Sequence, residues 1–156
     1  MSAESIGFLS QNIELGWLWQ FLAKYSEPCF IFLLVIFWII WLLGRHARWW
    51  RAAVSITTGL GITVPVSYLL RGIINRPRPF QTAVFEPLIE HGGGAGLPSN
   101  HAVATAVFAV CLFGSGNLKT AIVITFLTIM VGLSRVFAGL HYPGDILLGW
   151  LVGGVG

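Results

Sequence analysis

The sequence has few charged residues. Lys, Arg, Asp and Glu make up only 10% of its 156 residues, whereas 56% are hydrophobic. A soluble domain of this length would need many more polar side chains to cover its surface, but lipid accepts an apolar exterior directly. The net charge is only +3 and no basic stripe is present, which excludes an obvious nucleic-acid partner. The composition predicts one integral membrane domain over residues 1–156.

Cysteine and N-terminal positive charge are also scarce. The two cysteines, Cys29 and Cys111, both lie inside apolar runs, so we expect packing roles and no disulfide framework. Residues 1–23 contain no Lys or Arg ahead of their apolar residues. We therefore expect no cleavable signal peptide, and the first spanning helix takes over targeting.

Long apolar runs dominate what is present, and a bilayer core of about 30 Å needs roughly 20 such residues in a helix. The runs predict an all-α, polytopic transmembrane bundle, with residues 1–20 as an interfacial or lead-in segment. The fifth span starts with about twelve residues remaining. This is on the order of 18 Å of helix, so we expect a truncated chain or a helix completed by something else. The predicted spans are residues 28–44 with a start near Phe21, 52–74, 101–114, 119–140, and a fifth from Asp145.

Basic residues in the short loops predict the orientation, since such loops stay on the cytoplasmic side. The loop 44–51 and the turn before the fourth span contain Arg45, Arg48, Arg51 and Lys119. The extracytoplasmic face of the cell membrane then receives Arg71, the loop 75–99 and the stretch 134–145. Arg76 and Arg78 lie on that face against the usual trend, so they require a functional explanation.

The segment RGIINRPRPF, residues 71–80, is the first cluster on that face. Pro77 and Pro79 end the helix and stiffen the backbone beyond it. Arg71 alone fits an arginine that extends to the lipid headgroups. Three arginines on a rigid backbone also suit bidentate recognition of phosphate oxygens.

The second cluster is GLPSNHAVATAVFAV, residues 96–110. Ser99 suits the N-cap of the third span, which places Asn100 and His101 in a first turn that favours an anion. In the alternative interpretation, Ser99 only caps the helix and His101 meets water at the interface. The preceding HGGGAG, residues 91–96, is not a P-loop. This segment is either a mobile flap over the site or only a flexible connection, and we assign His91 no role.

The third cluster is SRVFAGLHYPGD, residues 134–145. Arg135 lies within the outer end of the fourth span, where an arginine costs roughly 2.5–3.5 kcal/mol at the helix centre and needs a polar partner. Asp145 can accept the Nδ1 proton of His141 and leave the Nε2 lone pair exposed. The alternative is an interfacial histidine beside a helix-capping aspartate.

Together, the three clusters resemble the signature of the type 2 phosphatidic acid phosphatase superfamily, which also includes vanadium haloperoxidases and bacterial acid phosphatases. Arg71, six residues and Arg78-Pro79 match the first part, with Arg in place of the usual Lys. Residues 98–101, Pro-Ser-Asn-His, match the second, with Asn in place of Gly. Ser134-Arg135, five residues, His141, three residues and Asp145 match the third completely.

The resemblance implies a metal-independent, cofactor-free phosphatase. His141 would be the nucleophile, Asp145 would orient it, and His101 would be the general acid and base. The phosphate-binding residues would be Arg71, Arg78, Ser99, Asn100 and Arg135. At residue 100 the side chain either adds a hydrogen bond or narrows access to the pocket.

The location of these residues indicates a lipid substrate whose tail stays in the bilayer. Membrane members of the family include undecaprenyl diphosphate phosphatases of cell-wall metabolism, and these are our first expectation. Phosphatidylglycerophosphate or phosphatidic acid phosphatase activity is the alternative within phospholipid metabolism. A lipid transporter or flippase is an alternative of another class. The lack of a visible internal repeat and the gathering of charges at one face disfavour it.

Overall fold

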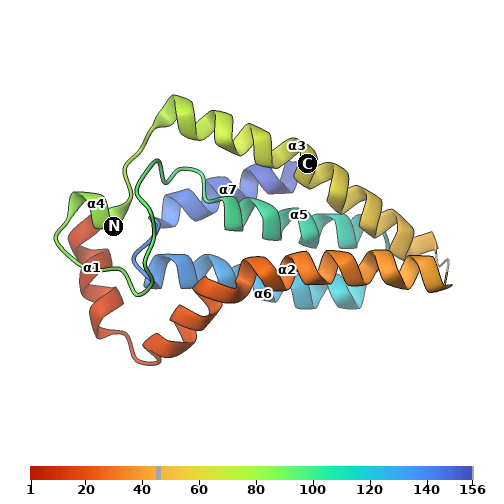
Figure 1. The fold of residues 1–156 in the computed structure, drawn as a ribbon, viewed down its shortest axis with the longest axis horizontal. Helices are drawn as coiled ribbons and strands as arrows, with labels where there is room; N and C mark the ends of the chain where they lie inside the picture. The colour runs from red at the N-terminus through yellow and green to blue at the C-terminus, as the bar shows by residue number, and fades with distance from the viewer. Residues whose placement is uncertain (45–46, 156) are drawn as a thin grey trace.

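The structure, a computed structural model, describes residues 1–44 and 47–155, and this part of the chain is helical, with no strand (Figure 1). Arg45, used for the predicted orientation, and Gly156 lie outside the described residues. Within them, α2, α3 and α6 are long and apolar enough to cross a membrane. The predicted all-α, polytopic membrane fold is confirmed. The helices are α1 (Ala3–Asn12), α2 (Gly16–Gly44), α3 (Ala47–Ile74), α4 (Pro79–Thr82), α5 (Asn100–Gly114), α6 (Leu118–Phe137) and α7 (Pro143–Val155).

The helices α5 and α7 are shorter than the bilayer core. They contain 15 and 13 residues, which at a rise of 1.5 Å gives about 22 and 20 Å against a core of about 30 Å. The sequence predicted that the last span is begun but incomplete, and it presented the third span, residues 101–114, as an ordinary one. In Figure 1 the N-terminus of α5 lies nearer the middle of the bundle than the C-termini of α3 and α6.

Three helix boundaries differ from the predicted spans by three or more residues. The helix α2 begins at Gly16 instead of near Phe21, and α3 begins at Ala47 instead of residue 52. Tryptophan and arginine at a membrane interface can continue a helix beyond its apolar run, which explains both extensions. The helix α6 ends at Phe137, before the predicted Leu140, because Gly139 has a φ of +79° and such left-handed residues terminate helices.

The helix α5 is at the centre of the bundle, where it packs against α3, α6 and α7. Glycines in α7 permit an especially close approach: a Cβ added at Gly153 would lie 2.3 Å from the carbonyl oxygen of Val103. At Gly149 an added Cβ would lie 2.8 Å from the carbonyl oxygen of Ser99. This packing brings the start of α7 beside the start of α5, where the Ser99 N–H donates to the Asp145 carbonyl oxygen at 3.0 Å.

The polar segments gather at one end of the bundle, here called the site end. Figure 1 shows α1, α4 and the loop that leads to α5 at this end, while the C-terminus of α2, the N-terminus of α3 and the α5–α6 connection lie at the other. Arg48 and Lys119, each in the first turn of its helix, belong to that other end. The C-terminus of α3 and the N-termini of α5 and α7 meet at the site end.

Candidate active site

Backbone hydrogen bonds fasten the polar segments of the site end together. The Gly96 N–H donates to the Arg76 carbonyl oxygen at 2.8 Å, and the Leu88 N–H donates to the Ala138 carbonyl oxygen at 3.0 Å. With the Ser99–Asp145 bond, these contacts link the end of α3, the loop before α5 and the segment between α6 and α7. Residues far apart in sequence are thus held in one place.

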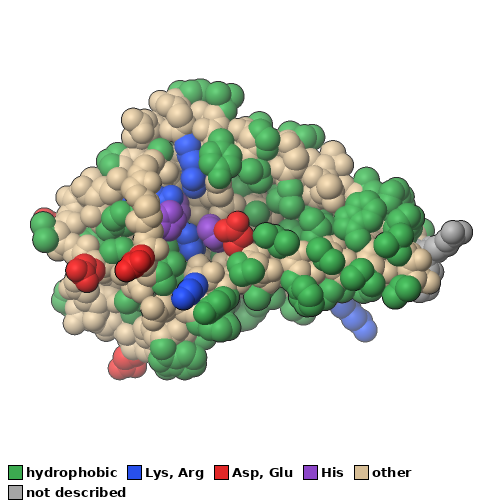
Figure 2. Space-filling view, viewed as in Figure 1, with side chains coloured by type: hydrophobic (Ala, Val, Ile, Leu, Met, Phe, Trp, Pro, Cys, Tyr) green, Lys and Arg blue, Asp and Glu red, His purple; other side chains and the backbone are tan. Residues whose placement is uncertain are grey.

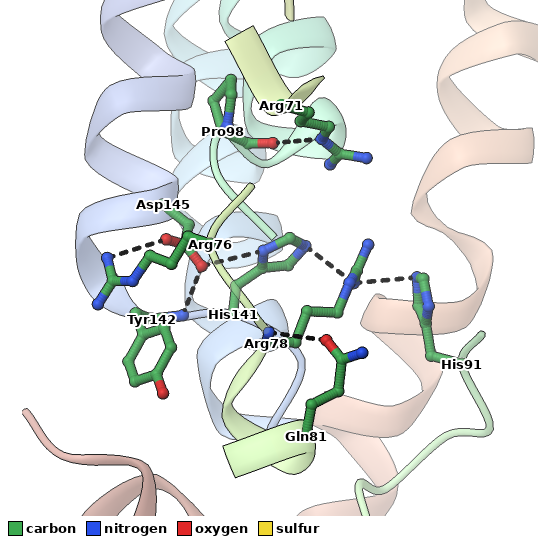
Figure 3. A network of polar contacts seen from close by, with 9 residues as sticks. All are labelled: Arg71, Arg76, Arg78, Gln81, His91, Pro98, His141, Tyr142 and Asp145. Atoms are coloured by element: carbon green, nitrogen blue, oxygen red, sulfur yellow. Dashed lines mark hydrogen bonds and ion pairs between the residues drawn. The ribbon is translucent and has the colours of Figure 1, made fainter. Parts of the chain in front are cut away.

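His141 and Asp145 form a buried pair with exposed fractions of 1% and 0%. The Nδ1 atom of His141 lies 3.3 Å from Oδ2 of Asp145 (Figure 3). The Tyr142 N–H donates to the same oxygen at 2.9 Å, and Nη1 of Arg76 donates to Oδ1 at 3.3 Å. Both carboxylate oxygens are therefore engaged, which fixes the side chain that accepts from the imidazole.

The second ring nitrogen of His141 faces an arginine. Nη1 of Arg78 donates to Nε2 of His141 at 3.4 Å, so the proton of the neutral ring belongs on Nδ1 and the lone pair on Nε2. Burial, opposed by the hydrogen bond to Asp145, lowers the pKa of His141 to about 3. The ring is therefore uncharged at neutral pH, and its Nε2 atom is chemically a nucleophile.

Arg78 also contacts the loop before α5. Its Nη1 atom lies 3.2 Å from Nε2 of His91, and a dashed line marks this contact in Figure 3. Burial lowers the pKa of His91, so the ring is neutral at pH 7 and its Nε2 can accept this bond. The Arg78 N–H donates to Oε1 of Gln81 at 2.9 Å, which fixes the start of α4. His91, which the sequence interpretation left without a role, thus holds an arginine of the first motif.

Two further arginines are anchored by backbone carbonyls. Nε of Arg71 donates to the Pro98 carbonyl oxygen at 2.8 Å, which connects α3 to the segment before α5. Nη1 of Arg135 donates to the Ala23 carbonyl oxygen in α2 at 2.6 Å, and Arg135 is only 2% exposed. This carbonyl is the polar partner that an arginine at this depth was predicted to need.

The N-terminus of α5 brings two more groups to the site. The hydroxyl of Ser67 donates to Oδ1 of Asn100, so the amide of Asn100 is attached to α3. Nε2 of His101 lies 3.3 Å from Oε2 of Glu27, a residue of α2. Ser99 occupies the N-cap position, as predicted, but its hydroxyl makes no capping hydrogen bond.

Five buried polar side-chain atoms have no hydrogen-bond partner among residues 1–44 and 47–155. Three of them belong to the three motif segments, one to each: Nε of Arg78, Oγ of Ser99 and Nε of Arg135. The other two are Oγ of Ser26 and Nε1 of Trp150. Buried donors of this kind are uncommon, because an unmade hydrogen bond is costly in a protein interior. An anion with several oxygens, such as phosphate, carries acceptors of the kind that these three donors lack.

A cavity of about 370 Å³ connects these groups to the lipid-facing helices. Figure 2 shows it as a hollow in which blue and purple side chains gather, with green apolar side chains beside it. One part is polar and the other is lined by apolar residues of α2, α3 and α5. The polar lining includes Arg71, Arg78, His91, Asn100, His101, Arg135 and His141; the apolar lining includes Phe30, Ile31, Leu34, Leu60, Val64 and Phe108.

Most of the residues predicted for the site do come together. Six of them line the cavity: Arg71, Arg78, Asn100, His101, Arg135 and His141. The other two predicted residues lie outside the lining. Asp145 contacts His141, and Ser99 directly precedes α5.

The sequence interpretation missed three contacting residues: Glu27, His91 and Arg76. Arg76 could have been noticed from the sequence, because it is a positive charge on the predicted extracytoplasmic side, where the positive-inside trend disfavours one. Glu27 is a carboxylate inside a predicted span, which is itself a signal of a functional site.

Comparisons with known proteins identify the family. The PAP2 superfamily model matches residues 48–156. The undecaprenyl-diphosphatase BcrC of Bacillus subtilis (strain 168) is 30% identical over 142 residues, which cover 90% of this chain and 70% of that protein. The lipid A 4'-phosphatase of Bacteroides thetaiotaomicron is 31% identical over 132 residues, which cover 76% of this chain and 57% of that protein.

A solved structure shares the fold. The PAP2-type phosphatidylglycerolphosphate phosphatase of Bacillus subtilis superposes with a TM-score of 0.71 at 22% identity, over 98% of this chain and 79% of that one. Fold, site and similarity together define a membrane-bound lipid phosphatase. The chain belongs to the PAP2 superfamily, which confirms the resemblance noted in its three motifs.

Proposed function

We propose that the chain hydrolyses undecaprenyl diphosphate to undecaprenyl phosphate at the extracytoplasmic face of the cell membrane, as one domain over residues 1–156. The cavity supports this proposal most directly. Its polar part combines the Nε2 atom of His141 with three arginines, and its apolar part runs between helices that face lipid. A phosphorylated headgroup suits the first part and a hydrocarbon tail suits the second. The similarity to a protein named undecaprenyl-diphosphatase supports the choice of lipid.

In the proposed first step, the Nε2 lone pair of His141 attacks the terminal phosphorus. An N–P bond forms while the P–O bond to the lipid phosphate breaks, and His101 donates a proton to the leaving oxygen. Asp145 stabilises the charged ring through Nδ1, to which it lies at 3.3 Å. The equatorial oxygens of the transferring group are held by Arg71, Arg78, Ser99, Asn100 and Arg135.

In the proposed second step, His101 accepts a proton from water as the water oxygen attacks phosphorus. The N–P bond breaks, and inorganic phosphate and neutral His141 result. The site's own side chains supply every proton transfer in these two steps, so the scheme requires no metal.

The proposed orientation is supported by the distribution of basic loop residues. Arg48 and Lys119 lie at the end opposite the site, where the positive-inside trend favours the cytoplasm. The loop 75–99 would then be the extracytoplasmic active-site loop.

The test is release of phosphate from undecaprenyl diphosphate in detergent with a chelator present. We expect His141→Ala to remove the activity, because no other lone pair replaces Nε2, while the elution profile of the protein stays unchanged. An active His141→Ala variant would refute the nucleophile. A wild-type protein that acts only on phosphatidylglycerophosphate or phosphatidic acid would refute the chosen lipid.

A further inference from the structure

We infer that Glu27 is a positioning residue for His101, which holds the imidazole ring and keeps Nε2 protonated for the reaction. The inference rests on the proposed function, in which His101 is the general acid and base. Glu27 belongs to α2, outside the three motif segments and outside the residues that the family model matches. Its Oε2 atom nevertheless lies 3.3 Å from Nε2 of His101.

A carboxylate in a membrane-spanning helix is costly unless it has a partner. In the part of the chain that the structure describes, Glu27 forms its ion pair with His101. The two partners differ in solvent exposure: the Glu27 side chain is 66% exposed and the His101 side chain is 19% exposed. The histidine is fixed in the first turn of α5, whereas most of the glutamate side chain lies at the surface.

The charges around His101 make this carboxylate necessary. Among the side chains described in residues 1–44 and 47–155, the cavity lining contains one acidic residue, Glu27. Arg71 from α3 and Arg135 from α6 line the same cavity as His101, and nearby positive charges disfavour a positive charge on an imidazole ring. Glu27 offsets them. The other titratable side chains of the lining are Tyr68, Arg78, His91 and His141.

The position of Glu27 also fits the order of proton transfers. The Nε2–H of His101 points at the glutamate in the resting site and must point at the leaving oxygen during the first step. The exposed glutamate can move aside as the headgroup enters, while its charge still favours the protonated ring. In the second step the ring takes a proton from water, and the carboxylate stabilises the imidazolium that results. Glu27 itself exchanges no proton with the substrate.

The experiment compares Glu27→Gln with Glu27→Asp, and uses Glu14→Gln as the matched control. Glu14 is an exposed carboxylate just before α2. Titration of His101 is followed by NMR in full-length protein labelled at the histidine ring, with His101→Gln used to assign the signal. We expect the midpoint in Glu27→Gln to move to lower pH by about one unit, the size expected for loss of an opposite charge at this distance. Glu14→Gln should leave it in place.

Phosphate release from undecaprenyl diphosphate gives the second readout. We expect Glu27→Gln to lower kcat about tenfold or more, a part of the roughly 10²–10⁴-fold that acid–base catalysis supplies, with little change in KM. Glu27→Asp should restore most of the rate because it keeps the charge.

An unchanged His101 titration in Glu27→Gln overturns the inference, whether or not the protein is active. A shifted titration with an unchanged kcat also overturns it, because the pair would then be structural only. Failure of the wild type to release phosphate refutes the proposed function instead, and the titration still reports whether the pair exists.

Discussion

Replacing Asp145 with asparagine tests how much of the rate depends on the partner of His141. The exchange keeps the shape of the side chain but removes its charge. In the structure the carboxylate accepts from His141 Nδ1 at 3.3 Å, from the Tyr142 N–H at 2.9 Å and from Arg76 at 3.3 Å. The phosphohistidine intermediate would place a positive charge on the ring, directly beside the lost negative charge.

The contacts set the size of the expected loss. A hydrogen bond to a charged group is worth about 1.5–3 kcal/mol, which corresponds to about 10- to 150-fold in kcat. The amide introduced by Asp145→Asn could also turn its NH₂ group toward Nδ1. The ring proton would then occupy Nε2 and remove the nucleophilic lone pair; a change of tautomer costs about 10⁴-fold in the serine-protease triad. We therefore expect kcat to fall between about 10- and 10⁴-fold.

The assay is phosphate release from a lipid diphosphate at saturating substrate, with Arg76→Gln as the comparison variant. Arg76 binds the same carboxylate through Oδ1, but its side chain is 41% exposed. Its contact is worth only about 0.2–1 kcal/mol, so we expect less than about a sixfold loss. An Asp145→Asn variant with at least half the wild-type kcat would refute the reasoning, as would an Arg76→Gln variant that is equally impaired.

Two further predictions concern packing and orientation. Gly153→Ala should lower the apparent melting temperature in detergent, because its Cβ would lie 2.3 Å from the Val103 carbonyl oxygen and overpacking costs about 1–3 kcal/mol. Gly154→Ala is the control and should leave the melting temperature unchanged, because an added Cβ there has no atom within 4 Å. Equal effects of the two variants would contradict the close α5–α7 contact. A cysteine at Gly92, where an added Cβ has open space, should react with an impermeant thiol reagent added outside intact cells. Labelling only after permeabilisation would reverse the proposed orientation.

The three motif segments could be found from the sequence because their spacing is local. Arg71 and Arg78 share one segment, and His141 lies four residues before Asp145, so the intended partners are close along the chain. The apolar runs likewise predicted the bundle. Helix ends were less predictable, since α2 and α3 continue through tryptophan and arginine residues that resemble loop composition.

Contacts between distant elements could not be predicted in this way. The Glu27–His101 pair requires α2 to pass beside the start of α5, and the His91–Arg78 contact requires the loop before α5 to fold back onto α4. Composition does not encode either approach. Glu27 could nevertheless have been identified as a candidate from the sequence, because an acidic side chain within a predicted span indicates a functional site.

The two-part cavity has a consequence for how the proposed reaction ends. Its products differ in phase: inorganic phosphate dissolves in water, whereas the lipid product stays in the bilayer. In the proposed reaction, the charged part of the cavity would release phosphate to water, while the apolar part beside it would release the lipid to the bilayer. The two products would then leave independently. Rebinding would then depend on two independent quantities, the phosphate concentration outside the membrane and the surface density of the lipid within it.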